Sequence, residues 1–290
     1  MSTTQTARTG STGLDRAEID GAGIDMAGIG RVRADGLAVL GPAEIALRKE
    51  IEAEFAEWIS GFGAVEVELP RLISIDDAAA IDYFHNFPQL GLTVSGLAEP
   101  DAVARRAKAG DPEVTAADLE APRYVLPSAA CYGLYFALRG IQVPEITLYT
   151  LRGNCFRRET HYTGLDRLLG FTMREVVAVG GRDAVEEFLI SAHQVLRTGA
   201  RRLGIEADLR PATDPFFEPD GARAKMQRLF PVKHELVSDR GVALASANFH
   251  RNFFGDRCGI RLSDGESAYT GCLGFGIERW ISEVHRRRTP

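Results

Sequence analysis

The chain has 290 residues and a formal net charge of -6, and hydrophobic residues make up 45% of it. This length and composition suit one large globular domain with a substantial core, and the negative charge disfavours a general affinity for polyanions. The sequence has no uncharged apolar run of membrane-spanning length and no secretory signal pattern, so we expect a cytoplasmic protein.

Small and polar residues dominate the N-terminal segment. Residues 1–35 are rich in Gly, Ala, Ser, Thr and Asp without a sustained period, which predicts a flexible, low-complexity tail. A single folded domain with small helical insertions is expected over 36–290. It opens with a helix over 42–59, where apolar residues recur at helical spacing. A strand over 64–69 follows, and Pro70 ends it.

The middle of the chain alternates short and long elements. The polar stretch 95–121 is interpreted as a surface insertion around a short helix over 101–109. Hydrophobic periodicity then predicts strands and helices in turn: a strand over 124–127, a helix over 131–138, strands over 145–151 and 172–179, and helices over 184–203 and 222–229.

Strands dominate the C-terminal part. They are predicted over 233–237, 242–247, 259–262 and 268–274, before a final helix over 277–286. Strands that cluster with few long helices between them indicate a mixed, mostly antiparallel sheet flanked by helices, which is an α+β fold.

Three separated segments carry residues that suit a nucleotide site. Arg157 and Glu159 lie two apart, so a strand would place both on one face. Phe171 follows a loop, and a glycine-rich strand at 274–276 leads to Arg279. Each feature has a simpler explanation, namely a surface ion pair, a core aromatic and a bend or bulge. Their combination favours a cradle for ATP.

Four cysteines stand at irregular positions, which does not suggest a disulfide framework. Cys131, Cys272 and Glu175 lie in or beside the segments just described, and they could form a three-ligand metal site. By spacing alone, Cys131 is better explained as a small buried hydrophobic residue, because the sequence has no Cys-x-x-Cys pair. Cys155 and Cys258 are interpreted as core residues.

The same segments resemble a known family. The stretch 156–159, with Phe171 beyond a loop, resembles the second signature motif of class II aminoacyl-tRNA synthetases, and 274–279 resembles the third. The predicted helix and strand that end at Pro70 resemble the first motif, through which these synthetases dimerise. The resemblance covers roughly residues 36–288. It implies a class II synthetase-like fold and a homodimer.

The metal-ligating residues narrow the resemblance. Cys131, Glu175 and Cys272 resemble the zinc-binding set of the atypical seryl-tRNA synthetases of methanogenic archaea. This implies one Zn2+ held by two thiolates and a carboxylate, with a fourth position open for the α-amino group of an amino acid. Within that group, compact chains without a tRNA-binding domain are amino acid:carrier-protein ligases, which favour glycine or alanine.

The resemblance also implies roles in binding ATP, which the family uses with Mg2+. Arg157 would hold the α-phosphate and the amino-acid carboxylate, and Arg279 the terminal phosphate. Glu159 would accept a hydrogen bond from the adenine amino group. Phe171 and the Arg279 side chain would enclose the ring, while Arg167 would reach the terminal phosphates.

The amino-acid pocket is expected around Ser246 and Asn248, because Ser246-Ala247-Asn248 resembles the Ser-x-Asn stretch of seryl synthetases. Ala130 is assigned to the same pocket. The family's acidic magnesium ligand, three positions before the serine, is replaced here by Ala243. The chain therefore departs from the family's magnesium arrangement.

The expected acceptor is a carrier protein and not tRNA, because only about 35 low-complexity residues precede the predicted core. The thiol of a phosphopantetheine arm would attack the aminoacyl-adenylate. Carrier proteins are usually acidic, so Arg223, Lys225 and Arg228 on the helix over 222–229 are candidate docking residues. A simple solvated charged face explains that helix equally well.

The sequence thus favours a zinc-dependent ligase that adenylates a small amino acid and transfers it to a carrier protein. A stand-alone seryl-type synthetase acting on tRNA is the second possibility. A non-catalytic synthetase paralogue is the third, and it is disfavoured because Arg157 and Arg279 are both present.

Overall fold

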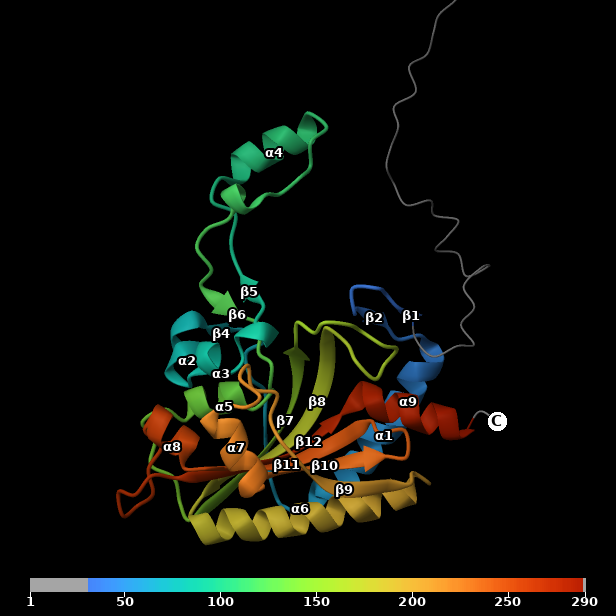
Figure 1. The fold of residues 1–290 in the computed structure, drawn as a ribbon, viewed down its shortest axis with the longest axis vertical. Coiled ribbons are helices and arrows are strands. Elements are labelled where there is room, and N and C mark those ends of the chain that lie inside the picture. The colour runs from blue at the N-terminus through green and yellow to red at the C-terminus, as the bar shows by residue number, and fades with distance from the viewer. Residues whose placement is uncertain (1–30, 289–290) are drawn as a thin grey trace, which may run out of the picture.

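A seven-stranded sheet forms the centre of the protein, whose structure is a computed structural model describing residues 31–288 (Figure 1). The strand order is β3-β7-β8-β12-β11-β10-β9, and every neighbouring pair is antiparallel except β3 and β7. The predicted mixed, mostly antiparallel sheet is therefore confirmed. Most of the predicted tail lies outside the described residues. The strands are β3 (Val65–Val67), β7 (Ile146–Phe156), β8 (Gly170–Gly180), β9 (Ala207–Ala212), β10 (Lys233–Ser238), β11 (Ala243–Arg251) and β12 (Tyr269–Gly276).

Three long helices cover one face of the sheet: α1 (Pro42–Ser60), α6 (Arg182–Arg202) and α9 (Ile277–Arg288). Each presents apolar residues at helical spacing to the strands. Aromatic rings join α1, β12 and α9, since the Phe55 ring lies 4.4 Å from that of Phe275 and 5.1 Å from that of Trp280. All three rings are fully buried, so this face is the main core and holds β12 rigidly.

Short helices line the opposite face, where a second core forms around Tyr135 and Phe254, whose rings stack 3.9 Å apart. This second layer is irregular, with many short elements, and it leaves space above the middle strands. Its elements are α2 (Ile75–Ala80), α3 (Tyr83–Asn86), the 3-10 helix η2 (Pro88–Leu90), α5 (Tyr132–Ala137), α7 (Ala222–Leu229) and α8 (Phe253–Cys258).

The predicted surface insertion projects from the body as an arm (Figure 1). At its base, β6 (Tyr124–Val125) pairs with β4 (Ile73–Ser74) and β5 (Thr93–Val94). At its tip, α4 (Pro100–Lys108) buries no residue. Besides the arm, β1 (Arg31–Val32) and β2 (Ala38–Val39) form a hairpin before α1, and η3 (Ala116–Asp118) is a 3-10 turn of the arm.

Two strand predictions were wrong. Residues 259–262 form no strand, because Gly259 ends α8 with a φ of 66° and Arg261 makes only isolated bridges. Conversely, β9 was not predicted, since Pro211 interrupts its apolar pattern. The proline is tolerated because β9 is an edge strand. In the part of the chain that the structure describes, we find no helix that is both long and apolar enough to span a membrane.

Candidate active site

A cavity of about 570 Å3 lies between the middle strands and the short helices, and the predicted metal ligands meet at its floor. Cys272 and Glu175 come from the adjacent strands β12 and β8, and Cys131 precedes α5. Because β12 and β8 are antiparallel, the register sets Gly274 opposite Glu175 and brings the carboxylate beside the thiol of Cys272. Three segments far apart in the sequence thus converge.

The three side chains form a compact buried cluster. One ligand atom from each of Cys131, Glu175 and Cys272 lies within 4.8 Å of the others. Burial, followed by the neighbouring Cys272, raises the pKa of Glu175 to about 8. A hydrogen bond from the Cys131 thiol lowers the pKa of Cys272, which makes Cys272 the more acidic of the two cysteines. Burial thus disfavours the charged form of Glu175, and the hydrogen bond to Cys272, followed by burial, disfavours that of Cys131, so these groups would need a bound cation to be ionised together.

The donor set fits zinc. Ligands about 2.0–2.3 Å from a tetrahedral zinc stand roughly 3.5–4 Å from each other, so a small contraction of the cluster would complete the site. Glu175 Oε2 is buried and has no hydrogen-bond partner among the described residues, as expected for an atom whose partner is a metal. Three protein ligands leave one position for a substrate, unlike a closed structural site.

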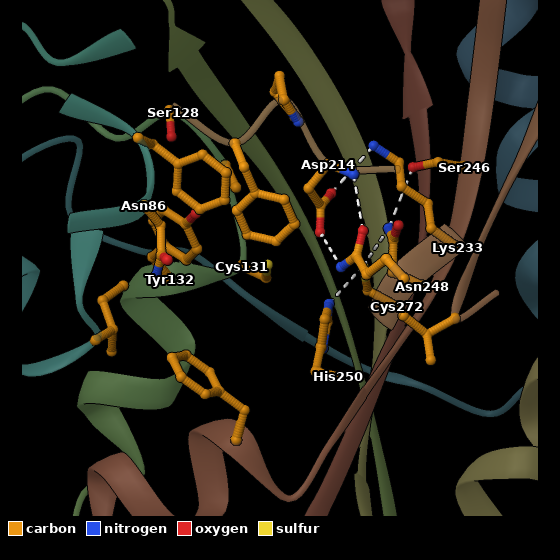
Figure 2. Close-up of a pocket in the computed structure, with 18 of the residues that line it drawn as sticks. Asn86, Ser128, Cys131, Tyr132, Asp214, Lys233, Ser246, Asn248, His250 and Cys272 are labelled. Carbon is orange, nitrogen blue, oxygen red and sulfur yellow. Dashed lines mark hydrogen bonds and ion pairs between the residues drawn. The ribbon is translucent and has the colours of Figure 1, made fainter. Parts of the chain in front are cut away.

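Polar groups beside Cys272 extend this cluster along β11. Asn248 Nδ2 donates to Cys272 Sγ at 3.2 Å, and His250 Nε2 lies 3.7 Å from the same sulfur. The other nitrogen of His250, Nδ1, lies 3.2 Å from Thr270 Oγ1 and 3.3 Å from the Tyr135 hydroxyl, which fixes the ring. Such outer partners orient metal-ligating side chains (Figure 2).

Two of the three predicted pocket residues, Ser246 and Asn248, line the cavity from β11, whereas Ala130 does not line it and its neighbour Ala129 does. Ser246 accepts a hydrogen bond from Asn248 Nδ2 at 3.2 Å, and Asn248 Oδ1 is buried without a partner among the residues described. Ala130 is 8% exposed. A Cβ added to Gly153 would lie 2.8 Å from the Cβ of Ala130. The small residue at each of these two positions lets the segment before α5 lie directly on β7.

Arg157 enters the same cavity from the end of β7. Its Nε donates to the carbonyl of Ser128 at 3.0 Å, and its guanidinium lies 5.1 Å from the centre of the Phe171 ring. Phe171 faces Cys155 across the β7–β8 pair. Cys155 is fully buried, as predicted, and also lines the cavity. The predicted Arg157 and Phe171 are thus in contact, and of the two Arg157 lines the cavity.

Arg279 lies at the first turn of α9, and its side chain is held by two main-chain carbonyls. Its Nε donates to Asp166 and its Nη1 to Ala243, both at 2.8 Å. Burial, then the nearby charge of Arg157, lowers the pKa of Arg279, and Arg167 contributes in the same direction. Three predicted phosphate-binding arginines therefore share one electropositive region.

Glu159 and Arg167 were assigned to opposite ends of ATP, and the structure places them in contact. Arg167 Nη1 donates to Glu159 Oε2 at 2.8 Å. The loop between β7 and β8 folds back at a turn in which Arg167 N donates to the Thr163 carbonyl. The loop therefore holds the two side chains against each other, and Arg279 donates to the carbonyl of Asp166 in the same loop.

A partly buried ion pair in the cavity was not predicted. Lys233, the first residue of β10, lies 3.2 Å from Asp214 and 3.1 Å from Glu235. Gln227 of α7 donates to Asp214 Oδ2 at 2.9 Å. Burial opposes ionisation of Asp214, but Lys233 and these hydrogen bonds lower its pKa overall. Figure 2 shows the pair beside Ser246.

The predicted docking residues on α7 differ in their surroundings. Arg223 donates to Asn86 at 2.7 Å and to Asp82 at 3.0 Å, so it fastens α7 to the α3 region. Arg228 donates to the Pro219 carbonyl at 2.7 Å. Lys225 is exposed. The inner side of α7 covers the cavity, so the helix separates it from solvent.

Some of the residues that the sequence analysis missed carried a usable signal. His250 follows Ser246 and Asn248 at a spacing of two, so a strand places all three on one face. Asp214 carried none, because it lies in an irregular loop after β9 and meets Lys233 only through tertiary folding.

Comparison with known proteins gives the family. No protein-family model matches the chain. The chain is 34% identical to amino acid–acyl-carrier-protein ligase 2 of Bradyrhizobium diazoefficiens, over 81% of this chain and 74% of the ligase. The chain belongs to the amino acid–acyl-carrier-protein ligase family. Its length therefore spans most of this ligase relative.

This ligase family member is also similar to seryl-tRNA synthetases. It is 32% identical to the type-2 serine–tRNA ligase of Methanocaldococcus jannaschii, over 56% of this chain but only 34% of that enzyme. Its fold matches the M. kandleri seryl-tRNA synthetase solved with A. aeolicus tRNASec, with a TM-score of 0.77 and 19% identity, over 88% of this chain and 54% of that one. The predicted class II synthetase fold is confirmed.

Proposed function

We propose that this ligase activates a small amino acid, glycine or alanine, with ATP and transfers it to the phosphopantetheine thiol of a carrier protein. The observation that carries the proposal is that the Cys131–Glu175–Cys272 cluster and Arg157 line one cavity, with Arg279 near enough for the charge of Arg157 to lower its pKa. The similarity to a carrier-protein ligase over most of its length supports the choice of acceptor.

In the activation step, a carboxylate oxygen of the amino acid attacks the α-phosphorus of ATP. The bond from that phosphorus to the bridging oxygen breaks, and pyrophosphate leaves, which makes the reaction AMP-forming. Arg157 would bind the carboxylate and the α-phosphate, and Arg279 and Arg167 would bind the leaving phosphates with Mg2+. Fixed cations lower the barrier because they stabilise charge that develops as pyrophosphate leaves.

Zn2+ bound by the three-residue cluster would act as a Lewis acid that takes the neutral α-amino group at its open position. The position of the amino group would then be set by the cluster of Cys131, Glu175 and Cys272. Arg157 would set the direction of the carboxylate. Ser246 and Asn248 line the remaining space, together with Ala129. Asn248 Oδ1, which has no partner among the described residues, can accept a hydrogen bond from the substrate.

In the transfer step, the thiolate of the carrier's arm attacks the carbonyl carbon of the adenylate. A carbon–sulfur bond forms, the carbon–oxygen bond to AMP breaks, and AMP leaves with the electron pair. The thiol proton is released. The product is an aminoacyl thioester on the carrier.

The carrier would dock on α7, where positive side chains face solvent and an acidic partner could meet them. Lys225 and Arg228 are the better probes, because Arg223 also fastens α7 to Asp82. Reversing Lys225 and Arg228 to glutamate should weaken transfer to the carrier and leave adenylate formation intact. An equal loss in both steps would argue against docking here.

A homodimer and an indifference to tRNA complete the proposal. The α1–β3 segment corresponds to the first synthetase motif, and edge strand β3 exposes Val65 at 56%. Sedimentation should give twice the monomer mass. Aminoacylation of tRNA should stay at background under conditions that load a carrier.

Amino-acid-dependent pyrophosphate exchange, with and without a zinc chelator, tests the function directly. We expect exchange with glycine or alanine that the chelator abolishes and added Zn2+ restores. Exchange with no amino acid would exclude the activation chemistry. Loading of tRNA in place of a pantetheinylated carrier would establish a synthetase.

A further inference from the structure

A second cavity of about 580 Å3 lies where the end of α7 passes the ends of β11 and β12. Two arginines, Arg182 and Arg251, line it together with aromatic and aliphatic side chains. We propose that this cavity binds the phosphodiester that joins the pantetheine arm to its carrier. The inference rests on the proposed function and adds a binding site for the charged end of the arm.

Continuity with the active site is the first support. Four residues line both cavities, so the second cavity adjoins the first. Arg251 stands three residues beyond Asn248 on β11, about 10 Å further along the strand from the metal cluster. A ligand that ends in a thiol at the cluster and in a phosphate at Arg251 would follow this strand. The shared residues are Phe230, Val232, Phe249 and Arg251.

The chemistry of the lining suits such an arm. The Phe249 and Tyr269 rings stack with centres 6.0 Å apart, and Leu229 and Phe230 are 71% and 57% exposed. These apolar side chains would cover the uncharged part of the arm. Phe249 N donates to the Val232 carbonyl at 2.7 Å, which fixes the end of the α7 segment against β11.

The charges suit an anion. Arg251 is exposed and forms no ion pair with any residue between 31 and 288. Its φ is 55°, at the point where the β11–β12 register shifts, so the backbone is held in a conformation that L-residues rarely adopt. Arg182 pairs with Glu186 at 2.9 Å, but both side chains are largely exposed, so a phosphate can compete for it. Arg251 is therefore the main anchor and Arg182 the second.

The test compares free pantetheine, free 4′-phosphopantetheine and the pantetheinylated carrier as acceptors from preformed adenylate. The wild type should use phosphopantetheine better than pantetheine. Arg251→Gln should reduce that preference about tenfold in kcat/KM, as expected for loss of one exposed charge-assisted contact. Arg251→Lys should restore part of it. Arg210→Gln, an exposed arginine on β9 outside both cavities, is the matched control.

The outcomes separate this site from the proposed function. Pyrophosphate exchange should be unchanged in Arg251→Gln. If the wild type showed no pyrophosphate exchange, the proposed function itself would be overturned. Equal use of pantetheine and phosphopantetheine by the wild type would overturn the phosphate site alone. So would a defect of Arg251→Gln that is seen only with the carrier, because Arg251 would then contact acidic residues of the carrier. A melting temperature matching the control verifies folding.

Discussion

Replacing Gly274 by alanine tests whether the cavity requires a bare backbone on β12. A Cβ there would lie 3.0 Å from Met173 Cε and 3.5 Å from Glu175 Cγ. The methionine end is flexible and can move, so we expect a stability loss of about 1 kcal/mol, or roughly 2–4 °C in Tm. The methyl group inside the cavity and against Glu175 should reduce pyrophosphate exchange on the order of ten- to a hundredfold.

The assay pairs thermal unfolding with exchange kinetics. Gly61→Ala serves as the control, because nothing lies within 4 Å of its added Cβ and its φ of -64° suits alanine. That variant should keep full activity. Activity of Gly274→Ala within twofold of the wild type would refute the reasoning. A loss of stability far above 1 kcal/mol would show that Met173 cannot move aside.

Three further predictions concern the metal, the pocket and the outer helix layer. Cys131→Ser should lower bound zinc well below one per chain by atomic absorption, whereas Cys258→Ser, also buried but outside the cluster, should retain it. Lys233→Met should cost about 1–3 kcal/mol in urea unfolding by leaving Asp214 without its cation; an unchanged midpoint would mean that the pair contributes nothing. Burial, then His234 and Arg197, lowers the pKa of His193 to about 4, so the native state binds fewer protons than the unfolded chain. Stability should therefore fall as pH drops from about 6.5 towards 4, and less steeply in His193→Gln; parallel curves would contradict this.

The fold was largely predictable because its strongest signals are local. The apolar spacing in 184–203 predicted the helix α6. The glycine-rich strand followed by the apolar pattern from Ile277 predicted the β12–α9 unit. The prediction failed where pairing context decides. Pro211 is tolerated only because β9 is an edge strand, which the sequence does not reveal.

The candidate site was predictable where motifs supply the residues. Cys131 and Glu175 carry no spacing signal, and resemblance to a family alone joined them to Cys272. Contacts made by irregular loops were not accessible in this way. Asp214 meets Lys233 because two separate segments pack together, and Arg167 meets Glu159 because the loop between β7 and β8 folds back on itself.

Loading of a carrier protein with a radiolabelled amino acid tests the central claim most directly. The purified chain, ATP, Mg2+ and Zn2+ are mixed with glycine or alanine and with phosphopantetheinylated carrier, unmodified carrier or tRNA in parallel. We predict label on the modified carrier alone, released by hydroxylamine as expected for a thioester, and its absence when Arg157 is replaced by alanine. Label on tRNA, or on none of the acceptors despite adenylate formation, would contradict the account.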